Sequence, residues 1–299
     1  MAFGKDYLKL HFIVFLWGFS AILGKLISIP AVEIVVFRSM LALLGMGVVI
    51  FFTKESWRVR SIDLAKLISI GLIVAIHWIS FFGSARVSNV SVSLIGFATN
   101  SLWAALLEPW FNKTRIKKTE LFFGLVVVSG LYIIFSFDFH YKLGLAVGIL
   151  AGFTSALFSV FNSRMVKRIE PRIITFYEMF GVFIGTLLFL PIYKLLWAQD
   201  GLLHLDPLPL DWLYLALLAG VCSVYAYTVS VELMKRISVF LMQLTLNLEP
   251  LYGIIMAIII FGEKEKMPAN FYLGTFVILC SVLTYPFLKK RFEKTVLID

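Results

Sequence analysis

The sequence predicts an all-α integral membrane protein with ten transmembrane helices arranged as two inverted five-helix repeats. Three observations predict this fold: the composition, ten long apolar segments, and a register in which one half of the chain resembles the other. The chain of 299 residues is 60% hydrophobic and 15% charged, with a mean hydropathy of +0.93. Soluble domains average roughly 45–50% apolar and about 25% charged residues. The composition therefore places most of the chain in a lipid bilayer.

Ten apolar segments have about the length that an α-helix needs to cross the hydrocarbon core, roughly 20 residues. They are Leu8 to Ile27, Val32 to Phe52, Leu64 to Ala85, Val90 to Phe111, Leu121 to Phe137, Leu143 to Val166, Ile173 to Leu196, Leu210 to Met234, Val239 to Phe261 and Phe271 to Leu288. The connections are short, so we expect one membrane domain without a separate soluble catalytic module. The first segment is too long for the apolar region of a signal peptide, so we expect it to remain as a helix.

The basic residues divide unequally between the two ends of these segments. With a cytoplasmic N-terminus, twenty of the 27 Lys and Arg residues flank the spans on the cytoplasmic side. Five lie on the other side, namely Arg86, Lys142, Lys194, Lys264 and Lys266. Cytoplasmic loops of membrane proteins carry such an excess of positive charge, so we predict that both termini are cytoplasmic and that the protein lies in the inner (cytoplasmic) membrane. The net charge of +9 then reflects topology and contact with anionic lipid, and predicts no nucleic-acid partner.

A shift of 150 residues aligns spans three to five with spans eight to ten without a gap. In this register Arg86, in the charged turn after the third span, pairs with Arg236 after the eighth. We predict a first repeat over residues 1–138, with spans one to five, and a second over 139–299, with spans six to ten. Five is an odd number, so the second repeat must enter the membrane from the opposite side. Inverted repeats place the working site near the bilayer midplane, where the two halves face each other.

Four segments resemble the EamA type of the drug/metabolite transporter superfamily. They are FLWGFSAILGKL in the first span, FRSMLALLGMGVV in the second, LEPLYGIIMAIIIFGEK in the ninth and YLGTFVILCSVL in the tenth. The resemblance covers nearly the whole chain. It implies ten helices around a central cavity, lined mainly by spans three, four, eight and nine beside spans one and six. It also implies transport of small metabolites, frequently export. The fourth span departs from the family pattern, because Asn100 replaces the usual proline and Asn112-Lys113 replaces Gly-Glu.

Glu249 and Pro250 lie in the middle of the ninth span, within LTLNLEPLYGII at residues 244–255. Glu249 is about eleven residues, roughly 16 Å, from the start of the span, which is too far for its side chain to reach either surface. A proline here frees a backbone carbonyl, and such a break is tolerated beside a cavity or a neighbouring helix. Pro250 thus predicts a helix break in the ninth span, whereas a matching break in the fourth span stays open because Asn100 replaces the usual proline. Two roles stay open for Glu249: a carboxyl that hydrogen-bonds another helix, or a cavity carboxylate that contacts substrate or carries a proton.

Other polar and aromatic residues of spans three, four, eight and nine fall at a similar depth. The predicted substrate-binding residues are His77, Trp78, Thr99, Asn100, Tyr225, Tyr227, Gln243, Asn247 and Glu249. Glu249 and His77 are the candidates for proton coupling, although a histidine in a membrane is also commonly a hydrogen-bond partner between helices. Structural or gating roles are predicted for Arg38, Asn162, Glu178 and Pro250.

The sequence favours a carrier over an enzyme. It contains no HExxH pair, no G-x-S-x-G elbow, no G-x-x-x-x-G-K loop and no paired aspartates for magnesium, so no catalytic residues are predicted. Its four histidines lack ligand spacing, and Cys222 and Cys280 lie in apolar segments, so we predict no metal, cofactor or disulfide. The prediction is a secondary transporter that works by alternating access as a monomer or homodimer. An intramembrane enzyme acting on a lipid-linked substrate is the alternative.

The predicted chamber also limits the substrate. One carboxylate, one histidine and several neutral amides suit a zwitterion or a cation better than a multiply anionic sugar phosphate, which would require two or more buried Lys or Arg residues. We therefore expect a small metabolite, with an amino acid or a related zwitterion or cation favoured. Export is the expected direction, and proton coupling is a hypothesis that rests on the depth of Glu249.

Overall fold

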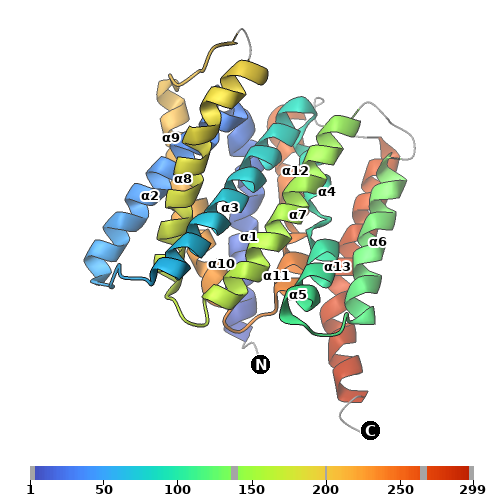
Figure 1. Cartoon of the computed structure of the whole chain (residues 1–299). Coiled ribbons are helices and arrows are strands. Elements are labelled where there is room, and N and C mark those ends of the chain that lie inside the picture. The colour runs from blue at the N-terminus through green and yellow to red at the C-terminus, as the bar shows by residue number, and fades with distance from the viewer. Residues whose placement is uncertain (1–3, 136–140, 199–200, 263–267, 296–299) are drawn as a thin grey trace.

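The computed structural model describes residues 4–135, 141–198, 201–262 and 268–295. Within these residues the chain forms helices and connecting loops without any strand, packed in one bundle (Figure 1). The predicted all-α membrane fold is therefore confirmed. The predicted boundary between the repeats, after residue 138, and the predicted outer charges Lys264 and Lys266 lie outside the described residues.

The helices of both halves follow the predicted apolar segments closely. The first half contains α1 (Gly4–Leu26), α2 (Ala31–Thr53), α3 (Ser61–Val87), α4 (Val90–Phe97), α5 (Asn100–Asn112) and α6 (Lys118–Phe135). The second half contains α7 (Lys142–Met165), α8 (Pro171–Leu196), α9 (Pro209–Leu217), the π-helix η2 (Leu218–Tyr227), α10 (Thr228–Leu233), α11 (Val239–Leu246), α12 (Glu249–Phe261) and α13 (Ala269–Thr295). Among the described residues, eight helical segments are long and apolar enough to cross a membrane. The other two predicted spans correspond to α6 and α13.

The two halves run in opposite directions through the bundle. Both chain termini lie at the same end, where α1 begins (Figure 1). Helix α7 begins at the opposite end, where it follows α6. The odd number of spans in the first half causes this inversion. We call the end that carries both termini the basic end, because most of the Lys and Arg residues of the loops lie there.

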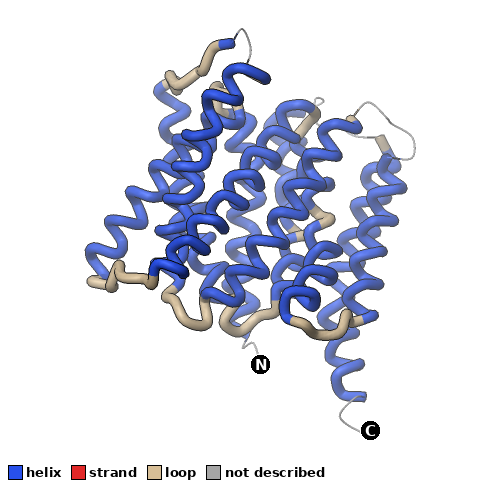
Figure 2. Tube along the Cα trace, viewed as in Figure 1, coloured by secondary structure: helices blue, strands red, loops and turns tan. Residues whose placement is uncertain are grey.

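The ninth span is broken in the middle, as its proline predicts (Figure 2). Helix α11 ends at Leu246 and α12 begins at Glu249. Between them, the N–H of Leu248 donates to the carbonyl of Thr245 at 3.0 Å, which is the tighter i→i−3 pattern. Pro250 is one of the first two residues of α12 and lacks the N–H that would have continued the helical pattern.

The fourth span is also broken, a point that the sequence had left open because the usual proline is replaced by Asn100. Helix α4 ends at Phe97 and α5 begins at Asn100. The N–H of Thr99 donates to the carbonyl of Gly96 at 3.3 Å, and the Thr99 hydroxyl donates to the same carbonyl at 2.9 Å. A short polar side chain that hydrogen-bonds nearby backbone competes with the helical ladder. Thr99 therefore accompanies a break in the first half at nearly the position where a proline does so in the second.

The eighth span contains a ten-residue π-helix, η2, which no sequence pattern predicted. Within it the Ser223 hydroxyl donates to the carbonyl of Leu218, five residues earlier, at 3.0 Å. π-Helical turns are rare in proteins, and those that do occur often lie at functional sites. This wide segment lies directly against the first half, because the indole N–H of Trp17 in α1 donates to the carbonyl of Cys222 at 2.9 Å.

Glycines allow helices of the two halves to approach closely. A Cβ built on Gly96 of α4 would lie only 2.9 Å from the Cα of Gly148 in α7. A Cβ on Gly181 of α8 would lie 3.1 Å from the Cα of Gly71 in α3. Small residues at such crossings permit the backbone contact that holds membrane helices together. The interface between the halves is therefore tightly packed around the cavity described next.

Candidate functional site

A cavity of about 60 Å³ lies between the helices of the two halves, and this volume holds a few water molecules. Its wall combines aromatic rings, thioethers and hydroxyl groups with one cation and one carboxyl. The lining residues are Trp17, Ser20, Arg38, His77, Trp78, Phe81 and Phe97 from the first half, and Ser155, Phe158, Ser159, Cys222, Tyr227, Ser230, Met234, Met242, Leu246 and Glu249 from the second. An enclosed, mostly apolar cavity with a few convergent polar groups is the usual form of a small-molecule site.

Arg38 supplies the positive charge of the cavity. It lies on α2, and only 3% of its surface is exposed. Its Nε–H donates to the Ser223 hydroxyl at 2.9 Å, and its guanidinium carbon lies 3.8 Å from the centre of the Trp78 ring. An Arg over an indole ring gains a cation–π attraction that strengthens when water is excluded. The π-helix and α3 together hold the guanidinium against the cavity.

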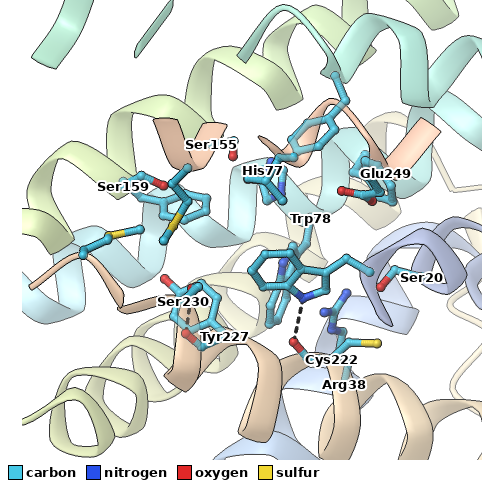
Figure 3. Close-up of a pocket in the computed structure, with 17 residues that line it drawn as sticks. Ser20, Arg38, His77, Trp78, Ser155, Ser159, Cys222, Tyr227, Ser230 and Glu249 are labelled. Carbon is cyan, nitrogen blue, oxygen red and sulfur yellow. Dashed lines mark hydrogen bonds between the residues drawn. The ribbon is translucent and has the colours of Figure 1, made fainter. Parts of the chain in front are cut away.

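Glu249 supplies the negative charge. The helix break places it at the first position of α12, where the helix dipole favours a carboxylate. Only 4% of its surface is exposed, and Figure 3 shows it at the same end of the pocket as Arg38 and Ser20. Arg38 and Glu249 line the same cavity, yet no salt bridge joins them within the described part of the chain. The site therefore presents a guanidinium and a carboxyl group that are not joined by a salt bridge.

His77 lies between the charged end and the opposite end of the pocket (Figure 3). Its Nδ1 lies 2.8 Å from the carbonyl oxygen of Ala151 in α7. A carbonyl oxygen only accepts hydrogen bonds, so Nδ1 carries the hydrogen and the neutral ring keeps Nε2 as an acceptor. Phe97 and Phe158 surround the ring, with centroid distances of 5.6 and 5.4 Å. The imidazole thus has a fixed orientation in an aromatic wall.

Hydroxyl groups gather at the other end of the pocket, where Figure 3 shows Ser155, Ser159, Tyr227 and Ser230. Gln243 of α11 fixes the α7 serines from behind, because its amide donates to the Ser159 hydroxyl at 2.7 Å and its carbonyl accepts from Ser155 at 3.3 Å. This end offers neutral donors and acceptors without net charge.

A buried network supports Tyr227 from outside the cavity. Its hydroxyl lies 2.7 Å from a carboxyl oxygen of Glu178, and the side-chain amide of Asn162 donates to both groups, at 3.1 and 3.2 Å. Glu178 and Asn162 are completely buried. A structural or gating role was predicted for both, and in the structure they lie behind Tyr227 and hold its hydroxyl in place.

The predicted binding residues divide into two sets. His77, Trp78, Tyr227 and Glu249 line the cavity, and so does Arg38, for which a structural or gating role was predicted. The remaining predicted residues lie outside the cavity wall: Thr99, Asn100, Gln243 and Asn247 are buried behind it, and Tyr225 is 47% exposed on the outer surface. Asn247 instead donates to the Ser101 hydroxyl at 2.9 Å and links the two helix breaks.

Several lining residues were missed at the sequence level. Ser155 and Ser159 are four positions apart on α7, with Asn162 three positions further on, so they share one face of the helix. This polar stripe in an apolar span was a usable signal. Trp17 and Phe158 gave no such signal, because an aromatic residue in a membrane span looks the same whether it faces lipid, core or cavity.

Salt bridges close the basic end between the two halves. They are Arg236 with Asp6, with two contacts of 2.9 Å, Arg168 with Asp63 at 2.7 Å, and Arg172 with Glu55. The hydrogen bonds from Arg236 to the Asp6 carboxylate also raise the pKa of Arg236, so the guanidinium keeps its positive charge. We call these three pairs the basic-end latch, since each joins a residue of the first half to one of the second.

The opposite end is held by fewer charges and contains a larger cavity of about 910 Å³. There the Asp211 carboxylate accepts from the backbone N–H of Ser28 at 2.9 Å and from its hydroxyl at 2.5 Å. Asp211 and Ser28 again belong to different halves. The bundle is thus closed by polar contacts at both ends, with ion pairs between the halves at the basic end.

Two inverted helical halves around a small cavity with a few polar groups are the arrangement typical of a secondary membrane transporter. Matches to a known family make the class specific. The model of the EamA-like transporter family matches residues 7–136 and again residues 142–285, once for each half. The chain belongs to the EamA-like transporter family and is a multi-pass membrane transporter of the drug/metabolite type.

No curated protein matches the chain. One solved structure, titled "Crystal structure of protein", shares the fold with a TM-score of 0.73 and 14% sequence identity. The match covers 98% of this chain and 100% of the other. At this identity the likeness concerns the fold alone.

Proposed function

We propose that the protein carries a small zwitterion, an amino acid or a close relative, across the membrane by alternating access. The observation that carries the proposal is that a guanidinium, from Arg38, and a carboxyl group, from Glu249, line one cavity without a salt bridge between them. Neither charge is neutralised by the other through a direct salt bridge in the described residues, so a ligand with both a carboxylate and an ammonium group can satisfy both. Charge-assisted hydrogen bonds of this kind are among the strongest polar contacts in proteins.

The rest of the wall favours an apolar or aromatic substituent on that zwitterion. Trp17, Trp78, Phe81 and Phe158 line the cavity beside the charges, and Met242 adds an adaptable thioether. A sugar phosphate would bring two or more negative charges to a site with a single arginine. A small cation that lacks a carboxylate would satisfy Glu249 and leave Arg38 without a partner.

The described conformation supports a cycle in which the halves move apart and together. A volume of about 60 Å³ is too small for an amino acid, so the cavity must widen when substrate enters. Opening at the basic end requires the basic-end latch to break, and opening at the other end requires the Asp211–Ser28 contact to break. Rocking of the two halves about the cavity would open the basic end and the other end alternately.

The basic end is proposed to face the cytoplasm, because positive charge concentrates on the cytoplasmic side of membrane proteins. The proposed location is the inner membrane, and the proposed direction is export, which the family resemblance favours. Glu249 is proposed to take up a proton when substrate leaves, with His77 as the neighbouring group that exchanges it. The support for this coupling is that both side chains line the same buried cavity.

Counterflow in proteoliposomes tests the proposed substrate class. Vesicles loaded with unlabelled amino acids are expected to accumulate the labelled compound, with aromatic and large apolar amino acids most active. Protein-free vesicles provide the background. Counterflow of sugar phosphates alone would contradict the proposal, and so would turnover of a lipid-linked substrate by the same preparation, which would favour the enzyme alternative.

Weakening the basic-end latch is expected to open the cavity toward the basic end. Each partly exposed ion pair contributes about 0.5–1 kcal/mol to the closed conformation. Replacing both Asp6 and Asp63 with Asn should therefore shift the equilibrium between the closed and the basic-end-open conformations about tenfold toward the open one. Cys222 lines the cavity and reports the opening, and Cys280 is replaced with Ser to remove the second described thiol. A membrane-impermeant thiol reagent on the basic side should therefore label Cys222 about ten times faster in the double variant.

The matched control removes two carboxylates whose ion pairs stay within the second half. Glu170 pairs with Lys235 and Glu232 with Arg236, so replacing both acids with Gln removes two ion pairs within the second half and keeps both partners of each latch pair. Labelling of Cys222 should stay at the starting rate. Equal acceleration in both double variants would show that the latch does not govern opening.

A further inference from the structure

A second cavity, of about 650 Å³, lies at the basic end between α3 and α7 and is separate from the central site. Figure 1 shows these two helices side by side along the near face of the bundle. The wall includes Lys66, Ser69 and Asn112 from the first half, and Arg164 and Lys167 from the second. We call this cavity the interfacial groove. None of its residues lines the central cavity, so the transport site does not account for it.

Three cations of the groove form no salt bridge in the part of the chain that the structure describes, although the charge of Lys66 also acts on the carboxylate of Asp63. Lys66, Arg164 and Lys167 are exposed, and within the described residues none of them forms an ion pair. The nearby carboxylate of Asp63 is already paired, with Arg60 at 2.8 Å and with Arg168 at 2.7 Å. The groove therefore has an excess of about three positive charges at its rim. Such a cluster attracts an anion with more than one acceptor oxygen.

The floor of the groove is apolar. Ile70, Ile73, Phe161 and Met165 line it below the charged rim. Further along α3, away from the basic end, Ile76 is 48% exposed and continues the apolar surface. A charged rim above an apolar surface matches an amphiphile that has an anionic head and hydrocarbon chains, and a free inorganic anion would use the rim alone.

We propose that the interfacial groove binds the headgroup of an anionic phospholipid from the leaflet at the basic end. The phosphate lies among Lys66, Arg164 and Lys167, the Ser69 hydroxyl and the Asn112 amide add hydrogen bonds, and the acyl chains run along the exposed face of α3. Basic pockets between transmembrane helices bind anionic lipids in this way. Each cation near the membrane surface contributes about 1 kcal/mol, which corresponds to somewhat less than a tenfold increase in affinity for the lipid.

The groove also lies where the two halves meet. Its cations come from both halves, and it adjoins the ion pair between Asp63 and Arg168 in the basic-end latch. A lipid phosphate that contacts both halves therefore favours the conformation that is closed at the basic end. This regulatory consequence rests on the proposed alternating-access function, whereas the lipid binding itself does not.

Native mass spectrometry of the full-length protein tests the binding. Purified protein is mixed with phosphatidylglycerol or with phosphatidylcholine of the same acyl chains. The wild type is expected to retain phosphatidylglycerol preferentially. Replacing Lys66, Arg164 and Lys167 together with Gln should reduce that affinity at least about tenfold. The matched control replaces Lys9, Lys54 and Arg58, which are exposed at the same end, with Gln and should keep the preference.

Three outcomes would overturn the proposal. Equal loss of preference in both triple variants would show diffuse surface charge instead of a site. Equal retention of the two lipids by the wild type would show no anionic selectivity. Displacement of phosphatidylglycerol by millimolar inorganic phosphate would assign the groove to a soluble anion. If the groove triple variant does not fold, Ala65→Trp tests the same site, because it fills the groove without removing charge and should also weaken phosphatidylglycerol binding.

Discussion

Replacing Glu249 with Gln is expected to reduce counterflow of a zwitterionic substrate at least about thirtyfold. The substituted amide has the shape of the carboxyl but no charge, so the ammonium group of the substrate enters a buried site without its anion. Removing one partner of a buried, hydrogen-bonded charge pair costs about 2–5 kcal/mol, and 1.4 kcal/mol corresponds to a factor of ten. The residual rate should also lose its dependence on pH, because the side chain that is proposed to take up the proton no longer titrates.

The measurement is initial counterflow over a pH range for the wild type and Glu249→Gln, normalised to the amount of reconstituted protein. Glu170→Gln serves as the matched control, since this acid is exposed at the basic end and lies outside the cavity. A control profile equal to that of the wild type shows that loss of a carboxylate alone is harmless. Unchanged rate and unchanged pH dependence in Glu249→Gln would remove both of its proposed roles.

The course of the helices was predictable because membrane spans obey a simple physical constraint. A helix must cross the hydrocarbon core with nearly continuous apolar residues, so α2 at Ala31–Thr53 differs from the predicted segment by one residue at each end. The inversion of the halves followed from the odd number of spans. Neither inference required any knowledge of how side chains pack.

The interior was less predictable, because depth along a helix does not say which way a side chain points. Gln243 and Tyr225 are both on spans that border the cavity, yet one is fully buried behind its wall and the other is 47% exposed on the outer surface. The π-helix η2 explains part of the difficulty. It rotates the residues of the eighth span away from the regular helical spacing and turns Cys222 and Tyr227 toward the cavity.

Arg38 shows how a correct observation led to an incomplete interpretation. A structural or gating role was predicted for it, since an arginine near the end of a span can extend several ångströms toward the surface. In the structure the side chain turns inward, because Ser223 accepts a hydrogen bond from it and Trp78 offers a ring face. Those two partners lie 185 and 40 positions away in the chain, so only the folded structure brings them to Arg38.

Replacing Arg38 with Gln is expected to abolish discrimination between an amino acid and its decarboxylated amine. In the wild type the carboxylate of the substrate meets the guanidinium, and the amine analogue leaves that buried charge without a partner. A site built for a charged group rejects an analogue that lacks it, here by at least about thirtyfold on the scale of 2–5 kcal/mol for a buried charge pair. Without the guanidinium, the two compounds should compete about equally for the Glu249 carboxyl group.

Competition against labelled substrate in counterflow measures this ratio directly. Arg38→Lys separates charge from geometry, since lysine keeps the positive charge but lacks the planar fork and the stacking on Trp78. The Arg38→Lys variant should still prefer the amino acid to the amine, but by a smaller factor than the wild type. Arg58→Gln, at an exposed position of the basic end, controls for loss of a cation elsewhere. If Arg38→Gln still prefers the amino acid by the wild-type factor, the carboxylate is recognised by another group, and the charge pair cannot be what selects the substrate.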